Sequence, residues 1–137
     1  MFTLRQIKKE DYIEVESIIK NNRIEDNLSQ GITYILKDNN DMIGVGKIIL
    51  RDDYGILKYI FVKEDCRGYN YGDAILRGLL YKCQSIGVNK IFSYKDDAYL
   101  LKKGFTYKEG DYSMEQKLYL GVDDFFKKSY CGDKNGF

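Results

Sequence analysis

Apolar residues recur along the chain with two different spacings, which predict a mixture of helices and strands. Tyr12, Val15 and Ile19 repeat at helical intervals, and so do Ile75 and Leu79. Apolar runs separated by short polar turns predict strands instead. The predicted helices are residues 9–21, 73–86 and 96–103. The predicted strands are residues 2–7, 32–37, 42–50, 56–62, 90–94, 105–108 and 112–120.

The order of these elements predicts an α/β (α+β) fold. Consecutive strands with short turns favour antiparallel hairpins, whereas the later strand–helix–strand order implies a mixed, mostly antiparallel sheet with helices on both faces. The length of 137 residues corresponds to one domain. We assign residues 1–120 to that domain and 121–137 to a tail. Val122–Phe126 is the part of the tail able to dock as one helical turn, and the rest is expected to fray.

Composition narrows the possible chemistry. The chain has no histidine, which excludes Ser-His-Asp and Cys-His nucleophiles, histidine metal ligands and a histidine general base. The formal net charge of +1 argues against a nucleic-acid partner. No apolar run has the length of a signal peptide or a membrane helix, so we expect a cytoplasmic protein that does not bind membranes. The three cysteines include no C-x-x-C pair and are expected to be reduced thiols.

One segment combines the features of an anion-binding site. The strand 56–62 leads into a loop that contains Gly68 and Gly72, and a helix follows. Unpaired amides and the helix dipole attract anions to such a helix N-terminus, and Arg67 adds a cation. Asn70 suits a position with positive φ. A pyrophosphate is the natural ligand, and a turn that binds nothing is the alternative. The spacing matches neither a P-loop nor a Rossmann fingerprint.

The stretch Val62–Leu76 resembles the acetyl-CoA motif of the GCN5-related N-acetyltransferases (GNAT), written Q/R-x-x-G-x-G/A after a strand that ends in valine. Leu4–Ile7 resembles the first strand of that family, and Leu101–Phe105 resembles its helix-ending K-x-G-F. The resemblance covers about residues 2–118. It implies acetyl-CoA as co-substrate, no metal, and direct acetyl transfer to an amino group of a small molecule or peptide, without a covalent enzyme intermediate.

The resemblance also implies which residues hold the cofactor. Main-chain groups of Phe61 and Val62 would pair with the pantetheine arm as an added strand does. The thioester would lie where the strands 56–62 and 90–94 separate. The pyrophosphate would be held by the backbone amides of Arg67, Gly68, Tyr69, Asn70, Tyr71 and Gly72.

Several positions depart from the family pattern. Asn70 replaces the middle glycine of the motif, and its tolerance of positive φ compensates for the change. Leu100 stands where many relatives have a catalytic tyrosine. Lys58 and Ile56 stand where relatives often carry a glutamate base. Transfer through water and substrate positioning therefore stays open as a mechanism.

Tyr99 and Tyr94 are the remaining candidates for protonating the leaving thiolate, and a packing or surface role is the alternative for each. Cys66 borders the loop, where a lowered pKa is conceivable, although an inert thiol is the simpler interpretation. Asp96 and Asp97 are interpreted as a helix cap rather than as an acid–base pair.

Two other classes of function stay open at this stage. One is a CoA-binding regulatory module that keeps the fold without catalysis, which the missing acid and base positions favour. The other is an interaction domain that binds no ligand. Phe125 and Phe126 are compatible with core packing, a substrate groove or a homodimer contact. The acceptor is not encoded in a recognisable motif and would be set by the loop 21–30 and the tail.

Overall fold

The computed structural model describes residues 1–107 and 117–127. The chain divides into two compact units. The first comprises Met1–Ile49 and Tyr59–Leu79, and the second comprises Leu50–Lys58 with the residues from Leu80 onward. The assignment of residues 1–120 and 121–137 to a domain and a tail stays a prediction.

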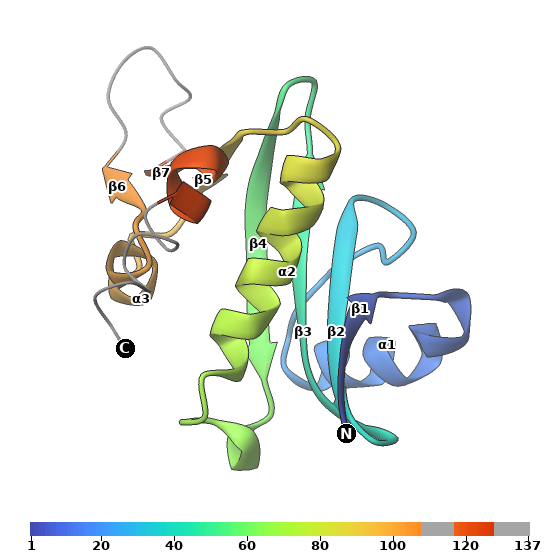
Figure 1. Cartoon of the computed structure of the whole chain (residues 1–137). Coiled ribbons are helices and arrows are strands. Elements are labelled where there is room, and N and C mark those ends of the chain that lie inside the picture. Colours follow the sequence, from blue (N-terminus) through green and yellow to red (C-terminus); the bar gives the residue numbers. More distant parts are fainter. Residues whose placement is uncertain (108–116, 128–137) are drawn as a thin grey trace. The chain divides into compact units, whose positions relative to one another are not determined.

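The strands form a seven-stranded sheet in the order β1-β2-β3-β4-β5-β7-β6 (Figure 1). Their bounds are Phe2–Gln6 (β1), Ile32–Asp38 (β2), Asp41–Leu50 (β3), Tyr54–Val62 (β4), Lys90–Ser93 (β5), Thr106–Tyr107 (β6) and Leu118–Gly121 (β7). The β4–β5 pair is parallel, whereas β1–β2, β2–β3, β5–β7 and β6–β7 are antiparallel. The predicted mixed, mostly antiparallel sheet is therefore confirmed.

The helices begin and end close to the predicted positions. Their bounds are Tyr12–Asn21 (α1), Tyr71–Ser85 (α2) and Ala98–Lys102 (α3). Helix α1 is preceded by a 3₁₀ turn at Lys9–Asp11, and a second 3₁₀ turn at Glu64–Cys66 was not expected. Helix α2 starts two residues earlier than predicted, because Asn70 adopts positive φ and the helical hydrogen bonds begin directly after it. Residues 122–127 are also helical.

In the first unit, helices α1 and α2 cover opposite faces of the strands. Val15 and Ile19 of α1 pack with Ile35 and Val45. On the other face, a Cβ added to Gly46 would lie 2.5 Å from Ile75 Cγ2 of α2, so the helix lies against bare backbone there. Neighbouring residues of a strand point to opposite faces. The alternation of positions 45 and 46 therefore confirms helices on both faces of the sheet.

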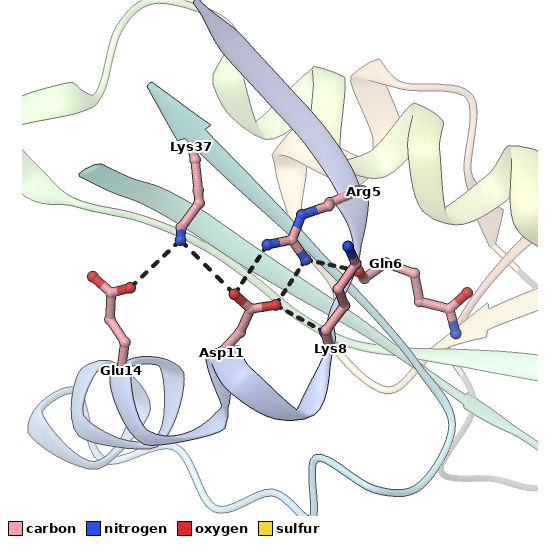
Figure 2. Close-up of polar contacts among 6 residues, drawn as sticks. All are labelled: Arg5, Gln6, Lys8, Asp11, Glu14 and Lys37. Atoms are coloured by element: carbon pink, nitrogen blue, oxygen red, sulfur yellow. Dashed lines mark hydrogen bonds and ion pairs between the residues drawn. The ribbon is translucent and has the colours of Figure 1, made fainter. Parts of the chain in front are cut away.

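A buried carboxylate, Asp11, ties β1 to the start of α1 (Figure 2). Its oxygens accept two hydrogen bonds from the Arg5 guanidinium, at 2.7 and 3.0 Å, and one from the Lys8 amide at 2.8 Å. The Lys37 ammonium on β2 lies 3.8 Å from Asp11 Oδ1, and Asp11 itself is only 3% exposed. The hydrogen bond from Arg5 is the main cause that lowers the pKa of Asp11.

A second buried polar cluster fixes the loop between α1 and β2. Lys47 is 1% exposed, and its Nζ lies 3.1 Å from Asp26 Oδ2, whose side chain is 4% exposed. The same ammonium donates to the Asn27 carbonyl at 3.0 Å. The Tyr59 hydroxyl donates to Asp26 Oδ2 at 2.8 Å. Burial, followed by the hydrogen bond to Asp26, raises the pKa of Tyr59. The cluster therefore connects β3, β4 and the loop through Asp26.

In the second unit, aromatic rings and an asparagine organise the packing. Tyr54 meets Phe92 edge-on at 5.3 Å between ring centroids, and Phe92 lies 5.4 Å from Tyr119. Asn89 holds the segment that follows β7 through two hydrogen bonds. Its backbone carbonyl accepts from the Val122 amide and its Oδ1 accepts from the Asp123 amide, each at 2.7 Å. Burial raises the pKa of the Cys83 thiol to about 12.

The last predicted strands are only partly covered by the structure. Thr106–Tyr107 and Leu118–Gly121 form a short antiparallel pair, as expected for two neighbouring strands. Of the other residues in the two predicted strands, 105 and 117 are described and lie outside the strands, and 108 and 112–116 lie outside the described residues. Within the part of the chain that the structure describes, no helix is long and apolar enough to cross a membrane.

Replacing Asp11 by Asn should lower the free energy of unfolding at pH 7 by about 2–3 kcal/mol, because a buried ionised acceptor of charge-assisted hydrogen bonds is lost. The lowered pKa of Asp11 stabilises the fold fully above the ordinary carboxyl pKa of about 3.9, and this contribution disappears as the pH falls through the lower folded value. Urea unfolding of both proteins between pH 7 and 2 should show the difference shrinking in acid.

The matched control for this prediction is Glu14→Gln, which removes a carboxylate 3.9 Å from the same Lys37 ammonium. Because Glu14 is exposed, the change should alter the free energy of unfolding by less than about 0.5 kcal/mol. A pH-independent difference between wild type and Asp11→Asn would contradict the role given to the carboxylate.

Replacing Asp26 by Asn should lower the free energy of unfolding by about 3–5 kcal/mol, since it leaves the Lys47 ammonium buried without its charge partner. Lys47→Met should lower the free energy of unfolding by a similar amount, because it removes the ammonium that pairs with the buried Asp26 carboxylate. The double variant should cost clearly less than the sum of the single ones. Chemical denaturation of all four proteins measures this coupling, and additive losses would refute the pairing.

Candidate functional site

The end of β4 has no β5 residue beside it. The parallel pairing runs from Tyr54 opposite Lys90 to Leu57 opposite Ser93, where β5 ends. Strand β4 nevertheless continues to Val62. Where one of two parallel strands continues beyond the other, the main-chain donors and acceptors of its last residues can pair with another extended chain.

Main-chain direction distinguishes the two residues that were expected to pair with a ligand. The Lys63 amide donates to the Ile43 carbonyl of β3 at 2.9 Å. A Cβ on Gly44 would lie 2.6 Å from the Phe61 carbonyl oxygen, so this carbonyl is also directed toward β3. Because successive residues of a strand direct these groups to alternate sides, Val62 presents its amide and carbonyl to the unpaired edge. Of the two predicted residues, the geometry favours Val62, and neither role is tested directly.

The loop between β4 and α2 contains two residues with positive φ. Gly68 and Asn70 have φ values of 92° and 62°. The first helical hydrogen bond of α2 runs from the Ala74 amide to the Asn70 carbonyl at 3.3 Å. Among the described residues, the amides from Gly68 to Gly72 have no backbone acceptor. This is the arrangement expected of a site for a phosphate group at a helix N-terminus.

Arg67 does not extend into solvent beside these amides. Its Nε donates to the Val62 carbonyl at 2.9 Å, and the guanidinium carbon lies 5.8 Å from the centroid of the Phe61 ring. The Arg67 amide itself is 3.4 Å from the Glu64 carbonyl. The Arg67 side chain is therefore directed to the end of β4, and its predicted role as a cation for the ligand stays a prediction.

An aromatic row flanks the loop. The rings of Tyr69 and Tyr71 are 5.7 Å apart, and Tyr71 lies 5.5 Å from Phe2. Tyr69 is 67% exposed. A hollow of about 310 Å³ beside these tyrosines is also lined by Asp38 and Asp41. Asp65 and Lys63 line the same hollow, so charges of both signs surround it.

Cys66 is not an activated thiol. Desolvation, together with a contact of 3.6 Å to Asp65, raises the pKa of Cys66. The conceivable lowering of this pKa is therefore contradicted, and the simpler interpretation of an inert thiol is retained. A nearby carboxylate opposes thiolate formation for the same reason that a nearby ammonium favours it.

The tyrosines considered as proton donors lie in the second unit. Tyr94 is exposed. Tyr99 is half-buried, and the Lys103 ammonium lies 5.7 Å from its ring centroid. Leu100, at the position of the family's frequent catalytic tyrosine, is 4% exposed and belongs to the core. Their role as acids stays a prediction.

The acidic pair before α3 has separate partners. Asp97 accepts the Tyr99 amide at 2.9 Å and caps the helix, which confirms the predicted cap. Asp96 instead accepts the Tyr107 hydroxyl at 2.9 Å, and this hydrogen bond raises the pKa of Tyr107. Two carboxylates with separate partners do not share a proton as an acid–base pair would. Within residues 1–107 and 117–127, no group of three His, Cys, Asp or Glu side chains is arranged to hold a metal ion.

Sequence reasoning missed two arrangements near this region. It did not find the cluster of Lys47, Asp26 and Tyr59, although a lysine inside the apolar strand Met42–Leu50 is a signal for a buried partner. It also did not find that Arg67 binds the Val62 carbonyl. No sequence pattern marks that second contact, because it depends on the path of the intervening 3₁₀ turn.

A family model described as Acetyltransferase (GNAT) family matches residues 1–103. The chain belongs to this family. This identification supports an N-acetyltransferase enzyme. A search of curated proteins finds no match.

Solved structures of GNAT proteins share the fold. A GNAT-family acetyltransferase from Staphylococcus aureus Mu50 aligns with a TM-score of 0.69 and 18% identity, over 89% of this chain and 99% of that one. N-acetylglutamate synthase from Neisseria gonorrhoeae, complexed with coenzyme A and N-acetyl-glutamate, aligns with a TM-score of 0.76 and 15% identity, over 89% of this chain and 35% of that one. The ribosomal-protein-S18-alanine N-acetyltransferase from Escherichia coli aligns with a TM-score of 0.69 and 15% identity, over 89% of this chain and 94% of that one. At these identities the likeness establishes the GNAT fold alone.

Replacing Asn70 by Gly should change the free energy of unfolding by less than about 0.5 kcal/mol, because glycine adopts positive φ readily. Asn70→Val should lower it by about 1–2 kcal/mol, since a β-branched residue is strained there. Thermal and urea unfolding of both variants measures the difference. Equal stability of the two variants would be inconsistent with a left-handed residue at the start of α2.

Proposed function

We propose that the protein transfers an acetyl group from acetyl-CoA directly to an amino group of a small molecule or peptide. The observation that carries the proposal is the junction of two features in one segment. Pairing with β5 ends at Leu57, before the Val62 main chain, and in the next loop the amides from Gly68 to Gly72 have no backbone acceptor among the described residues. Coenzyme A has an amide-containing pantetheine arm attached to a pyrophosphate, so it suits both features.

The cofactor would be held mainly by the backbone. Val62, with Phe61 as the other predicted residue, would bind the pantetheine arm, and the amides of the loop would bind the pyrophosphate. Tyr69 and Tyr71 contribute their amides in this scheme, while their side chains form the aromatic row on the loop. Gly68 leaves open space where a side chain would stand, since an added Cβ would meet no atom within 4 Å.

The transfer step forms one bond and breaks one. The neutral amine nitrogen attacks the thioester carbonyl carbon, the new C–N bond replaces the C–S bond, and the electron pair leaves on sulfur. The amine loses a proton to water or a base, and the thiolate gains one from an acid. Tyr94 and Tyr99 are the proposed acids. No covalent enzyme intermediate is needed, because the amine reacts with the thioester itself.

A second candidate function is a CoA-binding regulatory module without catalysis. The observation in its favour is the burial of Leu100, which fills the core where many relatives carry a catalytic hydroxyl. Both candidates bind acetyl-CoA, and only the first turns it over. A homodimer and a cytoplasmic location belong to both proposals.

Acetyl-CoA at 100 times its Kd should stabilise the protein by about 2.7 kcal/mol, observed as a rise in Tm. A thiol-release assay with glutamate, spermidine and an alanine-starting peptide then separates enzyme from module. These amines represent acceptors named for structural neighbours. No rise in Tm at millimolar acetyl-CoA would remove both candidates, whereas a rise without thiol release would favour the module.

Tyr94→Phe or Tyr99→Phe should lower kcat by about 10²-fold or more for the tyrosine that protonates the thiolate, and should leave acetyl-CoA affinity unchanged. Tyr81→Phe is the control, because Tyr81 is an exposed tyrosine of α2 at a distance in sequence from the loop. If all three variants keep the wild-type kcat, neither Tyr94 nor Tyr99 protonates the thiolate.

A further inference from the structure

Arg67 makes a contact that binding of pyrophosphate alone does not require. Its Nε–H donates to the Val62 carbonyl at 2.9 Å, and its guanidinium lies over the Phe61 ring. A guanidinium that is hydrogen-bonded through Nε and lies within cation–π distance of an aromatic ring is held at two points. Arg67 is thereby placed on the unpaired end of β4.

This position puts Arg67 in competition with an added chain. The Val62 carbonyl belongs to the edge that β5 does not cover, and an extended ligand would use that oxygen as an acceptor. The guanidinium carries further N–H groups beside the one already bonded. A second donor approaching the same oxygen would therefore meet a crowded, positively charged group. A ligand amide therefore competes with Arg67 for the Val62 carbonyl oxygen.

A phosphate group would supply the reason for Arg67 to turn. The amides from Gly68 to Gly72, which have no backbone acceptor among the described residues, follow Arg67 directly in the chain, so an anion bound to them would be adjacent to Arg67 in sequence. A guanidinium–phosphate hydrogen bond is charge-assisted and frequently bidentate, and is about twice as strong as one to a neutral carbonyl. Arg67 is exposed, so no packed side chain has to move with it.

We propose that Arg67 is a specificity-determining residue that covers the Val62 carbonyl and releases it when a phosphate-bearing ligand draws the guanidinium to the loop. The site therefore selects phosphorylated pantetheine thioesters, such as CoA derivatives, over pantetheine itself. This inference rests on the proposed function, because it assumes that the pantetheine arm pairs with the end of β4.

The test compares one variant with two ligands and expects effects of opposite sign. In Arg67→Ala, the affinity for CoA should fall about tenfold, since a charge-assisted hydrogen bond to phosphate is lost. The affinity for pantetheine should rise about two- to tenfold, the range of one hydrogen bond that no longer has to be broken. Calorimetric titration measures CoA binding, and displacement of bound CoA measures pantetheine binding.

Arg51→Ala is the matched control. Arg51 is also an exposed arginine whose side chain donates to a backbone carbonyl, that of Leu50 at 3.4 Å, but it precedes the other end of β4. This variant should bind both ligands as wild type does. Melting curves establish that each variant is folded, and Arg67→Gln replaces Arg67→Ala if the alanine variant is not.

The outcomes distinguish the proposed function from the coupling proposed here, in which phosphate binding releases the Val62 carbonyl from Arg67. If wild type does not bind CoA, the proposed function fails and the coupling fails with it. If wild type binds CoA but Arg67→Ala binds pantetheine no better than wild type does, or neither binds it measurably, the coupling is overturned and the proposed function stands. Weaker binding of both ligands would assign Arg67 a purely attractive role and would also overturn the coupling.

Discussion

The buried ion pair of Lys47 and Asp26 is the constraint around which the first unit is arranged. A charge removed from water needs a partner at short distance, and here the partner comes from the loop after α1. Because Tyr59 hydrogen-bonds the same carboxylate, the loop is tied to β4 as well as to β3. An irregular segment thereby gains a fixed position from polar contacts, and the apolar core of α1 packs beside it.

The candidate site follows from how strands are paired rather than from a special side chain. Strand β4 continues beyond the last residue that pairs with β5, and two residues of the loop that follows have positive φ. Backbone groups can recognise a cofactor without any particular side chain at those positions. A chain without histidine and with unusual residues in the motif is thus compatible with membership of the GNAT family.

Most of the fold was predictable because its signals are local. Helical spacing of Val15 and Ile19, turns rich in Asn and Asp, and the tolerance of Asn70 for positive φ each act within a few residues. The contacts that escaped prediction join distant segments. Asp26 precedes β2 in the sequence and pairs with Lys47 on β3. Arg67 reaches the Val62 carbonyl because a 3₁₀ turn bends the chain between them. Such pairings depend on tertiary geometry, which composition and spacing do not encode.

The two described cysteines have a kinetic consequence. Burial raises the pKa of Cys83 to about 12, and Asp65 contributes to the raised pKa of Cys66, so neither thiol is appreciably ionised near neutral pH. A thiol that stays protonated is a poor nucleophile toward a thioester. Neither of these two side chains is therefore suited to carry an acyl group at neutral pH.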